Sequence, residues 1–162
     1  MAKLTRKKTI LVKTEGSSYG QDASPTGGAN AILVRDIELT PLESDTVDRE
    51  LIRSYLGNFE TLLANQRAMV SFTCELVGSG AAGTSPAYGV ALEACAMAVT
   101  TVSGTSNTYA PISDASSMKS VTIYVNMDGV NHAITGARGT FTVNCELNEI
   151  PTITFEFTGK YN

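Results

Sequence analysis

The sequence of 162 residues has little of several features that define common protein classes. It contains no tryptophan, a single histidine and three cysteines, and aromatic residues make up only 7% of the chain. No apolar run approaches the length that spans a membrane, and the basic first residues lead into a short apolar segment unlike that of a signal peptide. We therefore expect no membrane partner and no signal peptide.

The cysteines are odd in number and too widely spaced for a disulfide framework. Cys74, Cys95 and Cys145 each fall on an apolar stripe, which is typical of reduced cysteines that pack as small hydrophobic residues. This pattern predicts three core thiols in a protein made in the cytoplasm.

Groups that carry catalysis are equally scarce. His132 follows a predicted turn without a neighbouring serine or cysteine elbow, and no spacing of histidine and carboxylate residues suggests a metal site. Residues 78–83 match GxGxxG. However, the strand before them alternates apolar with polar residues, a helical pattern begins only at Pro86, and no second βα unit follows. We expect no catalytic residues, no cofactor and no metal, and hence no enzyme.

Acidic residues are missing from the start of the chain. The first thirteen residues contain five bases, Lys3, Arg6, Lys7, Lys8 and Lys13, whereas the remainder holds 7 basic and 16 acidic residues. The contrast predicts a basic, flexible segment over residues 1–18 and one acidic domain over residues 19–162. A basic segment can bind nucleic acid, but five charges without a folded groove are more typical of a solvated arm.

The clearest positive signal lies in residues 121–161. Val121, Ile123, Val125 and Met127 alternate with polar or small residues, and Asp128-Gly129 follows, a pair typical of the type I′ turn of a β-hairpin. Residues 130–135 then form the returning strand. After a predicted turn at 136–139, alternation resumes over 141–147 and, beyond a turn at 148–151, over 153–157. We expect a four-stranded antiparallel meander with one apolar face.

The remaining segments complete a mainly β fold. Residues 9–13 fit a short edge strand, and residues 31–34 with 37–39 fit a bent strand that Pro41 ends. Residues 69–77 alternate clearly, and residues 86–98 or so form the one expected helix, with a face of small residues. Residues 99–118 have the composition of a loop. The predicted fold class is an antiparallel β-sandwich or barrel with one packed α-helix.

Residues 43–66 are ambiguous. Their apolar residues recur near helical spacing, and acids near the start suit a helix N-terminus. Gly57-Asn58 interrupts this pattern, and a continuous helix would need a partner for its apolar stripe. From the residues alone, a helix and an extended arm both remain possible.

Several runs resemble the tail tube proteins of long-tailed, siphovirus-type bacteriophages. The early runs are Tyr19 to Ile32, Leu39 to Arg49 and Tyr55-Leu56-Gly57; the later ones are Glu75 to Gly80, Pro86 to Gly89, Cys95, Tyr109-Ala110-Pro111, Asp128-Gly129 and Gly136 to Gly139. Their order and spacing carry the resemblance, which extends from about residue 19 to residue 161.

The resemblance implies a structural virion protein made in the host cytoplasm and located in the tail. Subunits of such proteins form rings, the rings stack, and the stack conducts DNA through its lumen without specific binding. Further partners would be the tape measure, the tail terminator and the baseplate initiator. Similar proteins often carry a second copy of the fold, so the rings would be hexameric or, with a tandem chain, pseudo-hexameric.

The same resemblance favours the extended form of residues 43–66, as an arm that reaches the neighbouring ring. The expected contact residues of the arm are Asp48, Arg49, Leu51, Ile52, Arg53, Tyr55, Leu56, Phe59 and Leu62. Two alternatives stay open. One is a tube protein of a secretion system, and the other is a monomeric immunoglobulin-like binding or decoration domain of a virion.

Overall fold

A computed structural model describes residues 7–49, 51–52, 54, 56–57 and 59–162. Seven strands form one antiparallel sheet in the order β2-β1-β7-β8-β9-β4-β3, and β5 and β6 form a separate hairpin. The strands are β1 (Lys8–Thr14), β2 (Ala31–Ile32), β3 (Ile37–Asp48), β4 (Thr61–Glu75), β5 (Met97–Val102), β6 (Ser106–Pro111), β7 (Val121–Met127), β8 (Val130–Asn144) and β9 (Thr152–Tyr161). The helical elements are α1 (Gly27–Asn30), α2 (Gly89–Ala94) and a 3₁₀ turn at Ala115–Ser117. The predicted mainly β class is confirmed.

The meander is present with three strands rather than four. Asp128 and Gly129 have φ values of 46° and 86°, as the predicted β7–β8 hairpin turn requires. The expected turn at 136–139 is wrong, because β8 runs through it without interruption. Gly136, with φ of 63°, instead forms a bulge at which the pairing of β8 with β9 shifts between Thr135 and Arg138.

The sheet curls towards closure because β2 and β3 are consecutive in sequence but lie at its two opposite edges. The short link between them is held to β4 by hydrogen bonds from Arg35 N to Thr73 O (2.8 Å) and from Thr73 N to Asp36 O (3.2 Å). The single bent strand predicted here is therefore wrong. Pro41 does not end β3 but lies inside it at a bulge on the edge of the sheet, a position where its missing N–H is tolerated.

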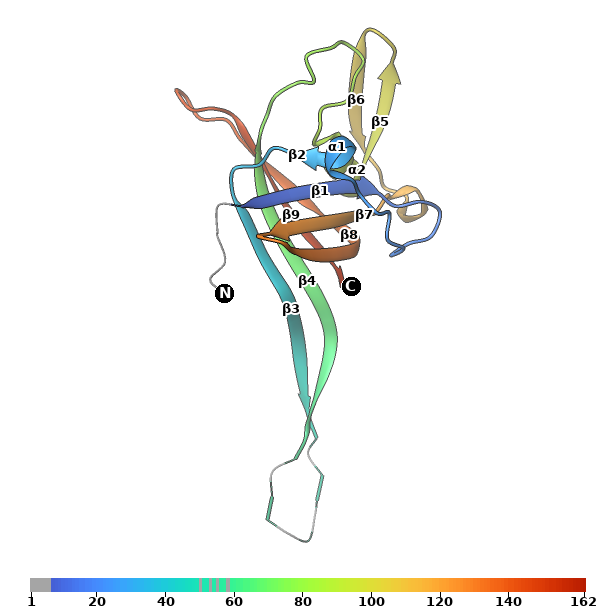
Figure 1. Cartoon of the computed structure of the whole chain (residues 1–162). Helices are drawn as coiled ribbons and strands as arrows, with labels where there is room; N and C mark the ends of the chain where they lie inside the picture. Colours follow the sequence, from blue (N-terminus) through green and yellow to red (C-terminus); the bar gives the residue numbers. More distant parts are fainter. Residues whose placement is uncertain (1–6, 50, 53, 55, 58) are drawn as a thin grey trace.

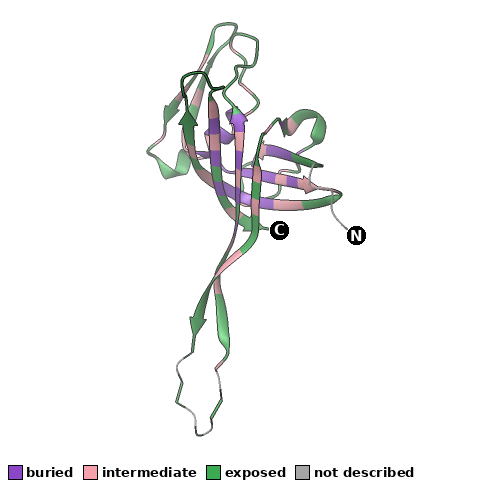
Figure 2. Ribbon diagram, turned by 90° about the vertical axis from the view of Figure 1, so that its left-hand side faces the viewer, coloured by how far each residue is buried: buried purple, intermediate pink, exposed green. Residues whose placement is uncertain are grey.

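The buried residues gather in the body of the curled sheet, whereas the outer parts of β3 and β4 are exposed (Figure 2). Phe72 of β4 contacts Phe155 and Phe157 of β9, with ring centroids 5.3 Å and 5.8 Å apart. Helix α2 packs against β1, β7 and β8 through small residues such as Ala91 and Ala94, which are buried. This close packing of a small-residue face on strands confirms the expected helix cover.

Two predicted boundaries around the helix are wrong. The helix spans six residues rather than residues 86–98, because Ala96 adopts a positive φ of 59° and β5 begins at Met97. The expected loop over 99–118 contains the β5–β6 hairpin. These two strands were not predicted, because neither strand has a buried residue and so neither needs an apolar face.

The structure also corrects the start of the domain and one cysteine. Residues 8–14 are not part of a flexible segment, since β1 pairs with β7 along its whole length and buries Ile10 and Val12. It is not the edge strand either, because β2 lies outside it. Cys74 and Cys95 are buried as expected, but Cys145 is exposed, because β8 ends at Asn144.

Candidate assembly surface

Strands β3 and β4 continue far beyond the body as a two-stranded ribbon (Figures 1 and 2). Their outer halves pair with each other alone, and the last paired residues are Asp48 and Thr61. Where it is described, the ambiguous segment 43–66 contains no helix, and residues 43–48 and 61–66 are strand. We call residues 43–66 the ribbon and residues 49–60 its tip.

The ribbon leaves the body at two successive bulges on opposite strands. β3 advances three residues from Thr40 to Glu43 while β4 advances two, and β4 then advances three residues from Arg67 to Ala64 while β3 advances two. Asn65, which adopts φ of 51°, lies within the second bulge. Bulges of this kind bend a strand pair and increase its twist, so they set the direction in which the ribbon projects.

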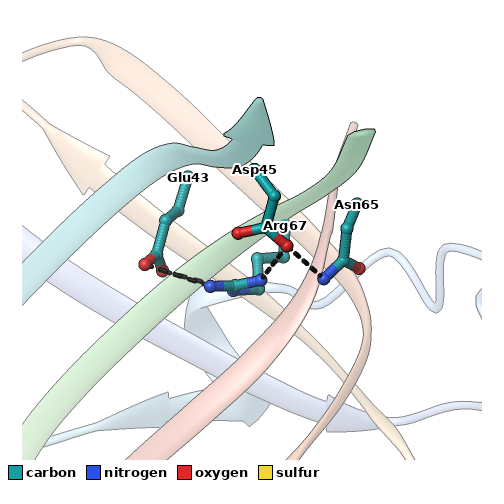
Figure 3. Close-up of polar contacts among 4 residues, drawn as sticks. All are labelled: Glu43, Asp45, Asn65 and Arg67. Carbon is teal, nitrogen blue, oxygen red and sulfur yellow. Dashed lines mark hydrogen bonds and ion pairs between the residues drawn. The ribbon is translucent and has the colours of Figure 1, made fainter. Parts of the chain in front are cut away.

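Arg67 connects the two strands at these bulges (Figure 3). Its guanidinium bonds Glu43, with Nη2 3.1 Å from Oε1, and lies 3.5 Å from Oδ2 of Asp45. Asn65 donates a hydrogen bond of 3.0 Å to the same Asp45 oxygen. The hydrogen bond to Glu43 raises the pKa of Arg67 above its ordinary value. A permanently charged cation therefore braces the base of the ribbon against two carboxylates.

The ribbon exposes large apolar side chains that the body does not cover. Val47 and Leu62 face each other across the strands, and Leu63 lies on the opposite face of the ribbon. The exposed fractions are 51% for Val47, 47% for Leu51, 104% for Ile52, 105% for Leu56, 47% for Leu62 and 60% for Leu63. A concentration of apolar surface of this kind marks an interaction site.

Charged groups of both signs accompany the apolar residues of the tip. Arg49 forms an ion pair with Glu60 across the two strands. Next to it, Thr61 Oγ1 donates a hydrogen bond of 2.9 Å to Asp48. The polar pairs thus link the strands at the point where backbone pairing stops.

Most of the residues expected to make inter-subunit contacts lie together on the outer part of the ribbon. Arg49, Leu51, Ile52 and Leu56 are exposed on the tip, Phe59 is half-buried there, and Asp48 and Leu62 are exposed on the strands next to it. Arg53 and Tyr55 lie outside the described residues. The cluster of Arg67, Glu43, Asp45 and Asn65 was not predicted from the sequence, although the mixed charges of residues 43–67 are a signal for strand-to-strand pairing.

Within the part of the chain that the structure describes, residues with catalytic potential are not brought together. His132 is half-buried on β8, with Nδ1 3.0 Å from the hydroxyl of Tyr161. Across the described ranges, no three histidine, cysteine or acidic side chains form a group suited to a metal ion. None of the helices described is both long and apolar enough to cross a membrane.

The fold combines a curled antiparallel β-sheet, two short α-helices and a projecting ribbon with exposed apolar side chains. The profile of the phage tail tube protein family matches residues 5–162, and the chain belongs to that family. The family consists of structural tail proteins and not of enzymes.

Solved structures share the fold at low sequence identity. The chain is similar to a protein in the cryo-EM structure of the anti-feeding prophage cap, the tube-terminating cap, with a TM-score of 0.51, 11% identity, and coverage of 99% of this chain and 88% of that one. It is also similar to a protein in the anti-feeding prophage baseplate, with a TM-score of 0.50, 8% identity, and coverage of 100% and 93%. Among proteins with curated functions, no sequence matches this chain significantly.

Proposed function

We propose that this protein assembles into rings that stack into the tail tube of a bacteriophage, the conduit through which DNA leaves the virion. The exposed apolar tip of the ribbon carries this proposal, because Ile52 and Leu56 are fully exposed in the single subunit. Apolar side chains exposed to water raise the free energy of a monomer, and an assembly that buries them removes this cost.

The position of the ribbon favours stacking over a closed dimer. The tip lies at one end of the elongated subunit, well away from the body (Figure 1). A contact between the tip and a different surface of the next subunit is heterologous, and a repeated heterologous contact extends indefinitely when it does not close into a ring. Rings joined in this way form a tube.

The proposed location is the virion tail, with assembly in the host cytoplasm. Partners would include the tape measure, the tail terminator and the baseplate initiator. DNA would pass through the lumen without specific binding, which the net charge of −4 supports, because surplus carboxylates repel phosphates. Hexameric or pseudo-hexameric rings fit the family, while the fold shared with anti-feeding prophage proteins keeps a secretion-type tube as the second candidate.

Removal of the tip tests the role of the ribbon. Because Asp48 and Thr61 are paired, residues 49–60 can be replaced by Asn-Gly, which closes the two strands with a type I′ turn. We expect the shortened protein to retain its β-sheet circular dichroism and thermal unfolding but to form no tubes in negative-stain images. Tubes from the shortened protein would contradict a contact made by the tip.

Two matched double variants test whether assembly depends on the apolar residues of the tip or on any exposed apolar residues. Ile52→Ser with Leu56→Ser should abolish the rise of light scattering with concentration. Val102→Ser with Val130→Ser removes two apolar side chains that are 51% and 39% exposed outside the ribbon, and this control should assemble at nearly the wild-type level. A wild-type protein that stays monomeric at every concentration, with or without tail extract, would instead favour the monomeric binding domain.

A further inference from the structure

A second apolar surface lies on the body, at the end of β4 away from the tip. It is a groove of about 750 Å³ between the β2–β3 link, the end of β4 and the loop that leads into α2. Its lining includes Leu33, Val34, Cys74, Val77, Ala87 and Tyr88. Leu33 is 92% exposed and Val77 is 57% exposed, so the groove presents apolar surface that the subunit itself leaves uncovered.

Strand β4 joins the groove to the ribbon. Thr61, at one end of β4, adjoins the tip, and Glu75, at the other end, lines the groove. At about 3.3 Å per residue, the fifteen residues of β4 separate these two ends by roughly 45 Å. Figure 1 shows the ribbon at one end of β4 and the β2–β3 link beside the other end. A copy displaced along the direction of β4 therefore brings its tip towards the groove of the first copy.

The two surfaces match in chemistry as well as in position. The tip offers Ile52 and Leu56, which are fully exposed, to a mostly apolar lining. Charges of both signs accompany each surface, with Arg49 and Glu60 on the tip and Arg35 and Glu75 at the groove. An interface here exchanges the Arg49–Glu60 ion pair within the tip for pairs of Arg49 with Glu75 and of Glu60 with Arg35, and such pairing fixes the register of an interface.

We propose that the tip of one subunit inserts Ile52 and Leu56 into the groove beside Leu33 and Val77 of a subunit in the next ring. This inference rests on the proposed stacking and names the surface that receives the ribbon. A copy of this chain is the occupant, because the tip and the groove lie at opposite ends of one strand and each leaves apolar side chains exposed.

Disulfide formation between two populations tests the contact. Cys145 is replaced by Ser in both, because it is the exposed native cysteine. The buried Cys74 and Cys95 stay, since burial raises their thiol pKa to about 11 and about 12, which keeps them unreactive near neutral pH. One population carries Ile52→Cys and a mass tag, and the other carries Leu33→Cys. The two are mixed, assembled, oxidised and separated without reductant.

The matched control carries Ser17→Cys in place of Leu33→Cys. Ser17 is exposed and follows the end of β1. Figure 1 shows the loop after β1 on the side of the body away from the β2–β3 link that lines the groove. A disulfide requires Cα atoms within about 7 Å. We therefore expect at least ten times more tagged heterodimer for the 52–33 pair than for the 52–17 pair, and only under conditions in which tubes form.

The outcomes distinguish the groove from the stacking itself. Suppose that tubes form, that the 52–33 and 52–17 pairs give equal yields of heterodimer, and that Leu56→Cys with Val77→Cys gives no heterodimer. This result would overturn the groove as the receiving surface but not the formation of tubes. A wild-type protein that never forms tubes would overturn stacking and the groove together. If cysteine at 33 or 77 alone prevents tubes while cysteine at 17 does not, the groove is required for assembly, which supports the proposal.

Discussion

Glu15 Oε1 accepts a hydrogen bond of 2.6 Å from the backbone N–H of Gly136, a residue 121 positions further along the chain. The other carboxylate oxygen accepts bonds from Ser120 Oγ (2.6 Å) and from the backbone N–H of Gly20 (2.8 Å), and Thr122 Oγ1 donates to the first oxygen at 3.1 Å. A single buried carboxylate thus ties the end of β1 and the loop after it to β7 and to the bulge of β8.

This arrangement predicts acid-sensitive stability. Burial alone would raise the pKa of Glu15, but hydrogen bonds from Ser120, Gly136, Gly20 and Thr122 together hold it below its ordinary value. A pKa that is lower in the folded state adds stability above the unfolded-state pKa, and this stability is lost as the pH falls through the folded-state pKa. Glu15→Gln should therefore lower the free energy of unfolding by about 2 kcal/mol at pH 7. As the pH falls, the free energy of unfolding should decrease less in this variant than in the wild type.

Urea denaturation between pH 7 and pH 3 measures both effects. Glu149→Gln, at an exposed position, is the control and should follow the wild type. If Glu15→Gln equals the wild type at pH 7, the carboxylate does not contribute as its contacts indicate.

The Arg67 brace at the base of the ribbon should act locally. Arg67→Ala leaves Glu43 and Asp45 without their cation, but the three groups are partly exposed and screened by solvent, so the free energy of unfolding should change little. Amide hydrogen exchange in residues 61–66 should become faster, because the bulges lose their cross-strand support. Arg49→Ala at the tip is the control and should leave exchange near residue 67 unchanged. If the amides of residues 61–66 exchange at the same rate in both variants, the backbone pairing alone holds the ribbon in place.

Gly139 allows β8 to lie close to β9. A Cβ atom at this position would fall 1.9 Å from Glu156 O and 2.8 Å from Phe157 Cδ1. Gly139→Ala should therefore cost about 2 kcal/mol or more in thermal or chemical unfolding. A Cβ on Gly78 meets no atom within 4 Å, so Gly78→Ala should change stability by less than about 0.5 kcal/mol. Similar losses for both variants would refute the steric explanation.

The three cysteines should differ in how fast they react with a thiol reagent. Cys145 is exposed and Cys74 and Cys95 are buried, so a maleimide should add once to the folded protein at pH 7 and three times after denaturation. Mass spectrometry counts the additions. Rapid addition of more than one label before unfolding would show that the core opens readily.

Parts of the fold could be predicted because their residues obey local rules. The Asp128-Gly129 turn needs only two residues with positive φ, and both have it. The inner half of β4 alternates between buried and less buried positions, because only one face meets the core. These signals lie within one element and do not depend on distant parts of the chain.

Other parts could not be predicted because the deciding interactions are not local. The ribbon is apolar on both faces, so it lacks the alternation of a half-buried strand, and its spacing imitated a helix. Pro41 and Gly136 indicated chain breaks, yet pairing with neighbouring strands carries the backbone past both as bulges. The apolar residues of the tip could be predicted from the sequence as candidate contact residues, and the structure shows Leu51, Ile52 and Leu56 exposed. The groove was not predicted, because residues 33 and 77 meet only after folding.

The continuity of β4 has a mechanical consequence. The strand that forms one half of the ribbon also pairs with β9 from Ala68 opposite Gly159 to Glu75 opposite Thr152. Hydrogen bonds in an antiparallel ladder lie perpendicular to the strands, so a pull on the tip along the strand shears every one of these pairs at once. The ladder shares the load instead of unzipping pair by pair, and the body resists tension along the ribbon far better than it resists sideways peeling.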